Sequence, residues 1–202
     1  MRALLAVWLL IVATASANET DVTAWQEITN SQGIRVYSAT AAETPIIKVK
    51  AIAEIDADLD SVLKIIEDET SYPEWVPYLS QAKVLQTISS NEKLVYNLFD
   101  APWPARDRDF IYRLLVQRDE NQLSYIMRSE ISPLMPEQEK IVRAWLMESH
   151  YYLTRIDQSR TRIELVFHAD PRGRLPVWIV NIVHRSFPFD AIKGLRAQLN
   201  AE

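Results

Sequence analysis

The stretch from Pro176 to Asn200 reads PVWIVNIVHRSFPFDAIKGLRAQLN and decides the fold expected for this chain. Apolar residues recur in it at helical spacing, and the expected apolar face comprises Trp178, Ile182, Phe189, Ile192, Leu195 and Leu199, with Ile179, Val183 and Phe187 beside them. Pro176 suits a first helical turn, whereas Pro188 is expected to kink the helix or divide it in two. A helix with so wide an apolar face needs a surface that covers it.

Most of the chain before residue 170 has the residue pattern of strands. Predicted strands cover residues 25–29, 34–38, 46–55, 82–88, 93–99, 108–116, 123–129, 140–148, 151–156 and 162–168. A second helix is expected to begin with Asp58 or Asp60 as its N-cap and to continue to residue 66, before a proline-rich connection at 71–78. Short polar turns favour antiparallel neighbours. The predicted architecture is an α+β fold in which a curved antiparallel sheet closes on the C-terminal helix.

Length and composition favour one globular domain and exclude several kinds of site. The chain has 202 residues, of which 48% are hydrophobic, and a formal charge of -5. Lys and Arg are dispersed, so we expect no nucleic-acid partner. The sequence has no cysteine, its glycines begin no phosphate-binding loop, and its three histidines lack the spacing of a metal motif. We therefore expect no cofactor and no metal.

The N-terminus has the pattern of an export signal. Arg2 precedes an apolar run at residues 3–13, and Ala15 to Ala17 form an Ala-x-Ala site with cleavage expected before Asn18. The run is shorter than the roughly 20 residues that span a bilayer, which favours a cleaved signal peptide over an uncleaved anchor. We expect a signal peptide at 1–17, one domain at 18–202, and a mature protein that is periplasmic or secreted.

The segment DAPWPARDRDF at residues 100–110 holds the most informative charges. Strand alternation places Arg108 on the more apolar face, which is expected to point inward, together with Phe110, Tyr112, Leu114 and Val116. An interior guanidinium needs a carboxylate, a buried water or a polar ligand group as its partner. The alternative is an exposed charge at the strand end, paired with Asp107 or Asp109, and periodicity alone does not decide between the two.

Other candidates are open to two interpretations. Arg143 shares its strand face with Trp145, and either points inward or lies on an exposed face with its aliphatic stem along the surface. Aromatic residues that either line a cavity or fill a core are Tyr112, Tyr125, Trp145 and Trp178. Ser129 and Ser149 have no nucleophile elbow around them, so the sequence supports no hydrolase triad and no catalytic residue is assigned.

The segment APWPARDRDF at residues 101–110 resembles a motif of START domains, the StAR-related lipid-transfer family. The likeness continues in order through the strand and helix at 49–66, the region of Trp75, IVRAW at 141–145 and DPRGRLPVWIVN at 170–181. The chain is similar to short, bacterial-type members and carries its own export signal. The resemblance implies a helix-grip fold, in which the sheet wraps the C-terminal helix around a hydrophobic lipid-binding tunnel. It also implies an arginine inside that tunnel, for which Arg108 is the candidate, with Asp107, Glu130 or Glu164 as its acidic partner.

The function implied by the resemblance is binding of a lipid or other hydrophobic small molecule, for transfer or sequestration, by a monomer that contacts membranes transiently and is not an enzyme. The residues expected to line the ligand cavity are Arg108, Phe110, Tyr112, Leu114, Arg143, Trp145, Trp178 and Ile182. The loop at 131–138 and the helix near Pro188 are candidate gates. Two alternatives stay open: a cyclase-like enzyme that polarises a carbonyl with Arg108, Arg143 and Tyr112, and a lipid sensor or adaptor that transports nothing.

Overall fold

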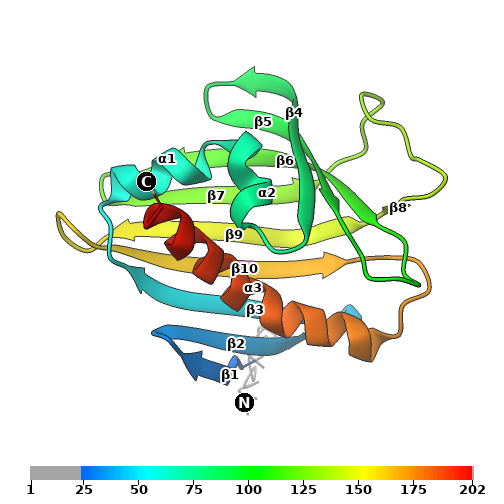
Figure 1. Ribbon diagram of the computed structural model, residues 1–202, viewed down its shortest axis with the longest axis horizontal. Coiled ribbons are helices and arrows are strands. Elements are labelled where there is room, and N and C mark those ends of the chain that lie inside the picture. The colour runs from blue at the N-terminus through cyan, green and yellow to red at the C-terminus, as the bar shows by residue number, and fades with distance from the viewer. Residues whose placement is uncertain (1–23, 202) are drawn as a thin grey trace, which may run out of the picture.

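The computed structural model describes residues 24–201, so the predicted signal peptide at 1–17 lies outside the described residues. One sheet makes up most of the described chain (Figure 1). Its strands are β1 (Gln26–Ser31), β2 (Ile34–Ala41), β3 (Thr44–Ile55), β4 (Leu79–Ser89), β5 (Glu92–Phe99), β6 (Arg108–Arg118), β7 (Gln122–Ser129), β8 (Val142–Arg143), β9 (Trp145–Arg155) and β10 (Thr161–Asp170).

The strand order is β1-β2-β3-β10-β9-β7-β6-β5-β4, and all of these neighbours are antiparallel. The short strand β8 lies off this path and pairs with β6 in parallel. Each run of consecutive strands is a meander, and the two meanders meet where β3 pairs with β10. The predicted antiparallel sheet is confirmed.

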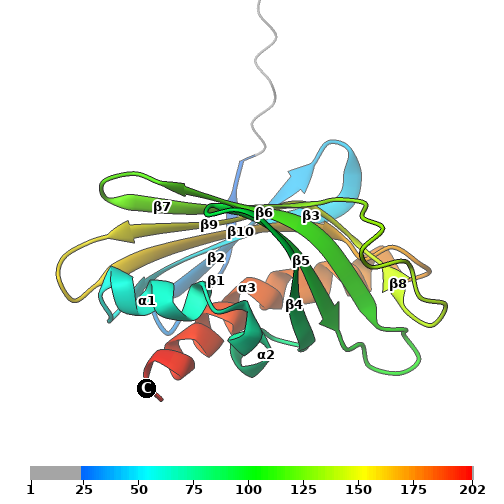
Figure 2. The same cartoon turned by 90° about the horizontal axis from the view of Figure 1, so that it is seen from above.

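The helices lie on the concave side of the curved sheet (Figure 2). They are α1 (Leu59–Ile66), the 3-10 turn η1 (Glu69–Ser71), α2 (Tyr72–Trp75) and α3 (Val177–Leu199). Asp58 is the N-cap of α1, because its Oδ1 accepts hydrogen bonds from the backbone N–H groups of Asp60 and Ser61, each at 3.0 Å. The proline-rich connection predicted at 71–78 therefore contains a short helix, with its proline in the first turn.

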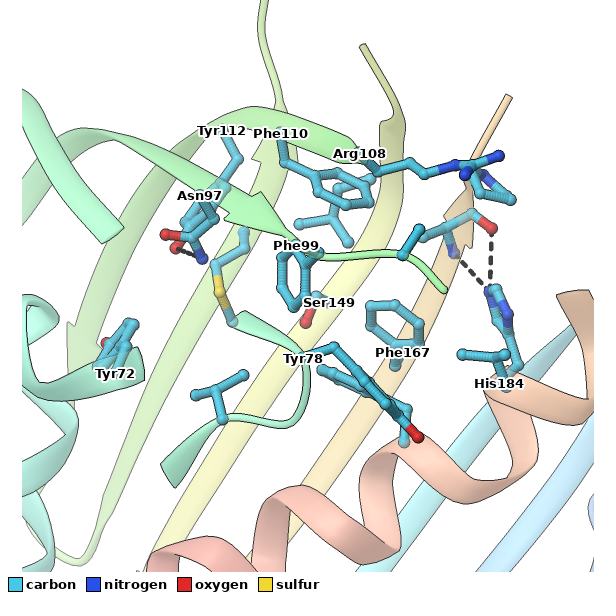
Figure 3. A pocket seen from close by; sticks show the side chains of 18 of the residues that line it. Tyr72, Tyr78, Asn97, Phe99, Arg108, Phe110, Tyr112, Ser149, Phe167 and His184 are labelled. Carbon is cyan, nitrogen blue, oxygen red and sulfur yellow. Dashed lines mark hydrogen bonds between the residues drawn. The ribbon is translucent and has the colours of Figure 1, made fainter. Parts of the chain in front are cut away.

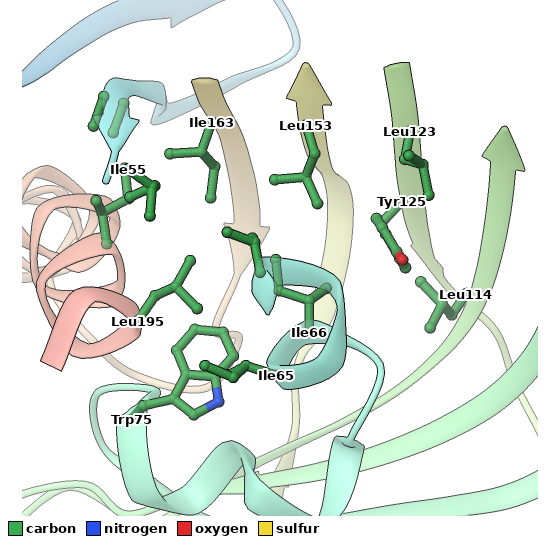
Figure 4. Packing of buried hydrophobic residues seen from close by; sticks show 14 of the residues in the cluster. Ile55, Ile65, Ile66, Trp75, Leu114, Leu123, Tyr125, Leu153, Ile163 and Leu195 are labelled. Carbon is green, nitrogen blue, oxygen red and sulfur yellow. The ribbon is translucent and has the colours of Figure 1, made fainter. Parts of the chain in front are cut away.

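The hydrophobic core lies where α1, α2 and the C-terminal half of α3 pack on the sheet (Figure 4). Ile65 and Ile66 of α1, Trp75 of α2 and Leu195 of α3 face the buried side chains of β3, β9 and β10. At the crossing of α2 and α3, a Cβ atom on Gly194 would lie 2.0 Å from the carbonyl oxygen of Trp75. Only glycine allows the two helices to approach this closely.

The helix α3 corrects two parts of the sequence prediction. It continues through Pro188 without being divided, and its buried stripe consists of Val180, His184, Phe187, Pro188, Ala191, Ile192 and Leu195. Trp178 and Ile182, predicted to face inward, are 65% and 55% exposed. A helix with 3.6 residues per turn keeps Val180, His184 and Phe187 on one face and turns Trp178 away from it. The polar His184 concealed this stripe in the apolar pattern.

The strand β9 differs from the prediction in where it begins and how far it continues. The predicted strands 140–148 and 151–156 form one strand that begins at Trp145, and the interruption lies at Ala144 instead. Ser149, which lies between the two predicted strands, pairs with Phe167 of β10 and continues the strand. The polar residues Ser149 and His150 interrupt the apolar pattern in the middle of β9, although both pair with β10.

Candidate functional site

A cavity of about 320 Å³ lies between the concave face of the sheet and the N-terminal half of α3 (Figure 3). Its lining comes from β5, β6, β7, β9 and β10, from α1, α2 and α3, from the loop at 100–105, and from the segments that follow α2 and β10. Most of these residues are apolar or aromatic, including Trp75, Phe99, Phe110, Leu146, Phe167 and Phe187. The volume lies near the lower end of the range for small-molecule sites. An enclosure of this kind suits one compact or single-chain hydrophobic molecule.

Four of the predicted cavity residues line this space: Arg108, Phe110, Tyr112 and Leu114. They follow one another on the inward face of β6, as the alternation predicted, and the interior position of Arg108 is confirmed. That these residues contact a ligand stays a prediction.

Arg108 is 8% exposed and lies at one end of the cavity, where its Nη1 donates to the carbonyl of Arg106. Its Nε is buried and has no hydrogen-bond partner among the described residues. Burial, reinforced by the charge of Arg106, lowers the pKa of Arg108, and Asp107 opposes this shift. No ion pair joins Arg108 to a carboxylate within residues 24–201. Arg108 therefore lies at the end of the cavity lining with one buried donor, its Nε, that has no partner among the described residues.

None of the three acidic candidates forms an ion pair with Arg108. Glu130 binds Arg113, with 2.9 Å between Oε1 and Nη2, and Glu164 lies 3.9 Å from the Nζ of Lys50. Asp107 is close enough to influence Arg108 electrostatically, but its Oδ1 accepts from the backbone N–H of Ala101 at 2.9 Å.

The other four predicted residues, Arg143, Trp145, Trp178 and Ile182, do not line the cavity. Arg143 forms a two-bond ion pair with Asp109, with 2.8 Å from Nε to Oδ1 and 3.0 Å from Nη2 to Oδ2. The guanidinium of Arg172 lies over the ring of Trp145, with 5.1 Å between Cζ of Arg172 and the ring centre. The interruption at Ala144 explains the error, because it places Arg143 in β8 beside Asp109.

The loop at 131–138, a candidate gate, contributes no residue to the cavity. Met135 packs on a separate cluster formed by Leu94, Tyr96 and Ile111, and its carbonyl accepts from Nη2 of Arg143 at 3.1 Å. Ile111 belongs to the face of β6 opposite Arg108, so this loop covers the outer side of the sheet. Its position gives no support to a gating role.

The structure adds polar cavity residues that sequence reasoning missed. Asn97 donates from Nδ2 to the hydroxyl oxygen of Tyr112 at 3.0 Å. Ser149 is buried and lines the cavity from β9. The alternation of Val95, Asn97 and Phe99 in β5 was a usable signal, because it places one amide on an apolar face. Ser149 gave no such signal, because it lies between the strands predicted at 140–148 and 151–156.

His184 joins α3 to the last strand at the cavity wall (Figure 3). Its Nδ1 lies 2.9 Å from the carbonyl oxygen of Val180, and its Nε2 lies 3.0 Å from the carbonyl oxygen and 3.4 Å from the nitrogen of Ala169. Both ring nitrogens therefore lie within hydrogen-bond distance of backbone groups of Val180 and Ala169. Burial lowers the pKa of His184.

Residues 24–201 contain no group of three His, Cys, Asp or Glu side chains that could hold a metal ion. No helix within this part of the chain is long and apolar enough to cross a membrane.

The loop at 100–105 and α3 both contribute residues to the cavity lining, and exposed apolar residues lie on or next to these two segments. Trp103 in that loop is 92% exposed, and Tyr78, whose carbonyl accepts from the N–H of Asp100 at 2.8 Å, is also exposed. Trp178 and Ile182 are exposed on the first turns of α3. We name these four residues the mouth patch.

A family model for the START domain matches residues 13–202. This chain belongs to the START domain family. This chain is 23% identical to the phosphatidylcholine transfer protein of Bos taurus over 163 residues, which is 78% of this chain and 76% of that protein. Two solved structures share its fold. A fragment of a STAR-related lipid transfer protein from Xanthomonas axonopodis has a TM-score of 0.77 at 23% identity, covering 87% of this chain and 98% of that one. The human StAR-related lipid transfer protein 5 has a TM-score of 0.83 at 18% identity, covering 90% and 89%. The helix-grip fold is thereby confirmed.

Proposed function

We propose that this START domain protein binds one amphiphile in the cavity and carries it between membranes. The acceptor or anionic head of the amphiphile would lie at Arg108, and its apolar part would extend toward Tyr72 at the other end of the cavity. The observation that carries the proposal is a buried guanidinium, with no carboxylate partner in the described chain, at one end of an enclosure lined by apolar side chains. Other START proteins bind or transfer lipids, which is consistent with this proposal.

The affinity would come mainly from removing an apolar chain from water. Each buried methylene contributes about 0.8 kcal/mol, so a long chain needs no covalent chemistry to be retained. The tyrosine hydroxyls of the lining add no charge, because burial raises the pKa of Tyr72, Tyr112 and Tyr151. Arg108 is therefore well placed to select the charge of the bound molecule.

Exchange of the amphiphile would occur at the mouth patch during transient contact with a membrane. Indole and phenol rings favour the boundary between headgroups and hydrocarbon, and Trp103, Trp178 and Tyr78 supply three exposed rings of this kind. Inserting them would bring the cavity next to the acyl chains. The loop at 100–105 and the start of α3 replace the loop at 131–138 as the candidate gate.

Catalysis is not proposed, because the cavity supplies no positioned acid and base among the described residues. The nitrogens of His184 are both bound to backbone groups, and the phenol of Tyr112 is held in its neutral form. Arg143, which the cyclase alternative required, lies outside the cavity. No observation favours the adaptor alternative over a carrier.

The test is native mass spectrometry of the protein after incubation with vesicles of a total lipid extract, followed by identification of the lipid released on denaturation. We expect one amphiphile on each chain, and a mass that corresponds to one chain, since we propose a monomer. Protein recovered without any added mass would refute the carrier function.

The mouth patch is tested by the transfer rate of a fluorescent octadecanoic acid between phosphatidylcholine vesicles. Trp103→Ala should slow transfer about fivefold, which corresponds to about 1 kcal/mol of lost apolar insertion. The matched control is Ile131→Ala, which removes another exposed apolar side chain from the loop outside the cavity. Equal rates for the two variants would mean that the membrane is met elsewhere.

We propose that transfer takes place outside the cytoplasm. This rests on the export pattern of residues 1–17, and the test is the N-terminal sequence of the protein recovered from the periplasm or medium of its own cells. We expect a chain that starts at Asn18. A cytoplasmic protein that retains Met1 would refute export and leave lipid binding unaffected.

A further inference from the structure

Asn97 and Tyr112 form a polar pair inside the apolar cavity, and the rings of Phe99 and Phe110 separate this pair from Arg108 (Figure 3). Asn97 is 7% exposed and Tyr112 is buried as well. The Nδ2 of Asn97 donates to the Tyr112 hydroxyl at 3.0 Å, while its Oδ1 is buried and has no hydrogen-bond partner in residues 24–201. A buried acceptor without a partner is costly, and its position on the cavity wall indicates that a bound molecule satisfies it.

The pair presents one donor and one acceptor side by side. The Tyr112 hydroxyl accepts from Asn97, so its own O–H remains available to the cavity, and burial raises the pKa of Tyr112 and keeps that proton in place. The Oδ1 of Asn97 is the neighbouring acceptor. If the amide is turned over, the Tyr112 O–H donates to Oδ1 and an N–H of Asn97 becomes the free group. In both arrangements one amide group lacks a partner in the cavity.

A hydroxyl group complements this pair in both arrangements, because it can donate and accept at the same oxygen. A carboxylate would place a second charge deep in an apolar cavity, far from the arginine that could compensate it. A methylene leaves the amide unpaired. The chemistry at this point of the cavity therefore matches an alcohol.

We propose that the cavity selects an amphiphile that bears a hydroxyl group on its apolar body, and that Asn97 and Tyr112 bind this hydroxyl. The inference rests on the proposed carrier function and names the class of its cargo. Asn97 pairs with Phe110, two residues along β6 from Arg108, which is a backbone separation of about 7 Å. The hydroxyl would thus lie several carbon atoms along the chain from a head group held at Arg108.

The experiment measures the affinity of octadecanoic acid and of two mid-chain hydroxyoctadecanoic acids by calorimetry. The wild-type protein should bind the better hydroxy acid about tenfold more tightly than octadecanoic acid, the factor that corresponds to about 1.4 kcal/mol. In Asn97→Leu this ratio should fall to about one, whatever the absolute affinities. Tyr112→Phe, which removes a single oxygen, should lower the ratio as well and provides the test if Asn97→Leu does not fold.

Ser132→Ala is the matched control, since it removes a buried hydroxyl that lies outside the cavity. It should retain the wild-type ratio, and loss of the ratio there instead of in Asn97→Leu would overturn the assignment to Asn97 and Tyr112. A wild-type protein that binds octadecanoic acid and both hydroxy acids equally would overturn the inference while the carrier function stands. Failure to bind any of the three acids or any vesicle lipid would refute both.

Discussion

The ion pair between Asp109 and Arg143 makes a strong prediction about stability. Asp109 is 1% exposed, and Arg143 holds both of its oxygens while also donating to the Met135 carbonyl. Removing one partner from a buried pair leaves the other charge uncompensated, which costs about 3–5 kcal/mol. We expect Arg143→Met to lower the free energy of unfolding by this amount.

The magnitude can be measured by urea unfolding followed by circular dichroism. Arg113→Met is the matched control, because Arg113 also holds two carboxylate contacts, from Glu130 and Glu92, but its side chain is 41% exposed. An exposed pair is worth at most about 1 kcal/mol, so the control should lose far less stability. The double variant Asp109→Leu with Arg143→Met removes both charges, and it should be more stable than Arg143→Met alone.

The stability losses of Arg143→Met and Arg113→Met show whether burial gives the first ion pair its larger weight. If Arg143→Met costs no more than Arg113→Met, then the Asp109 carboxylate is either hydrated or protonated when its partner is gone, and burial at this site has little energetic weight. If the double variant is less stable than the wild-type protein, the ion pair contributes more to stability than its burial costs.

Two further predictions concern α3. Gly194→Ala should lower the free energy of unfolding in urea by about 1–3 kcal/mol, because the added methyl group would lie 2.0 Å from the Trp75 carbonyl oxygen. The control is Lys193→Ala, at an exposed position of the same helix. A Gly194→Ala variant that is more stable than the wild type would contradict the close approach of α2 and α3. Burial lowers the pKa of His184, so the folded protein binds this proton less readily than the unfolded chain, whose histidine pKa is about 6.5. The stability that neutral His184 contributes is present above about pH 6.5 and is lost as the pH falls below it. His184→Gln should therefore reduce the fall in the free energy of unfolding between neutral and acidic pH. An NMR titration of His184 in the folded protein with a midpoint at or above about 6.5 would contradict the prediction.

Local sequence rules predicted the parts of the site that lie within one regular strand. The alternation in β6 placed Arg108, Phe110, Tyr112 and Leu114 on the cavity side, and each of them lines the cavity. The same rule failed for Arg143, because it holds only while the strand is continuous, and the interruption at Ala144 separates β8 from β9. Strand boundaries depend on pairing with distant segments, which a local pattern does not contain.

The predicted buried face of α3 was wrong for a different reason. The buried stripe of α3 includes His184, whose two nitrogens are satisfied by backbone groups of Val180 and Ala169. A polar residue can be buried at little cost when its partners are in place, but those partners come from β10 and from the helix backbone. The apolar pattern alone shifted the predicted face toward Trp178 and Ile182, which the structure leaves exposed beside the cavity mouth.

The adjacent charges Arg108 and Asp109 explain why the cavity holds a positive charge. Neighbours in a strand point to opposite faces of the sheet, so these two residues do not neutralise each other although they are consecutive. Asp109 finds its partner on the outer side, where β8 brings Arg143 beside it. Arg108 is left on the inner side with a backbone carbonyl and a free Nε. Because the carboxylate next to it in sequence is already bound, the cavity favours a ligand that supplies the missing acceptor, which is why we place the head group there.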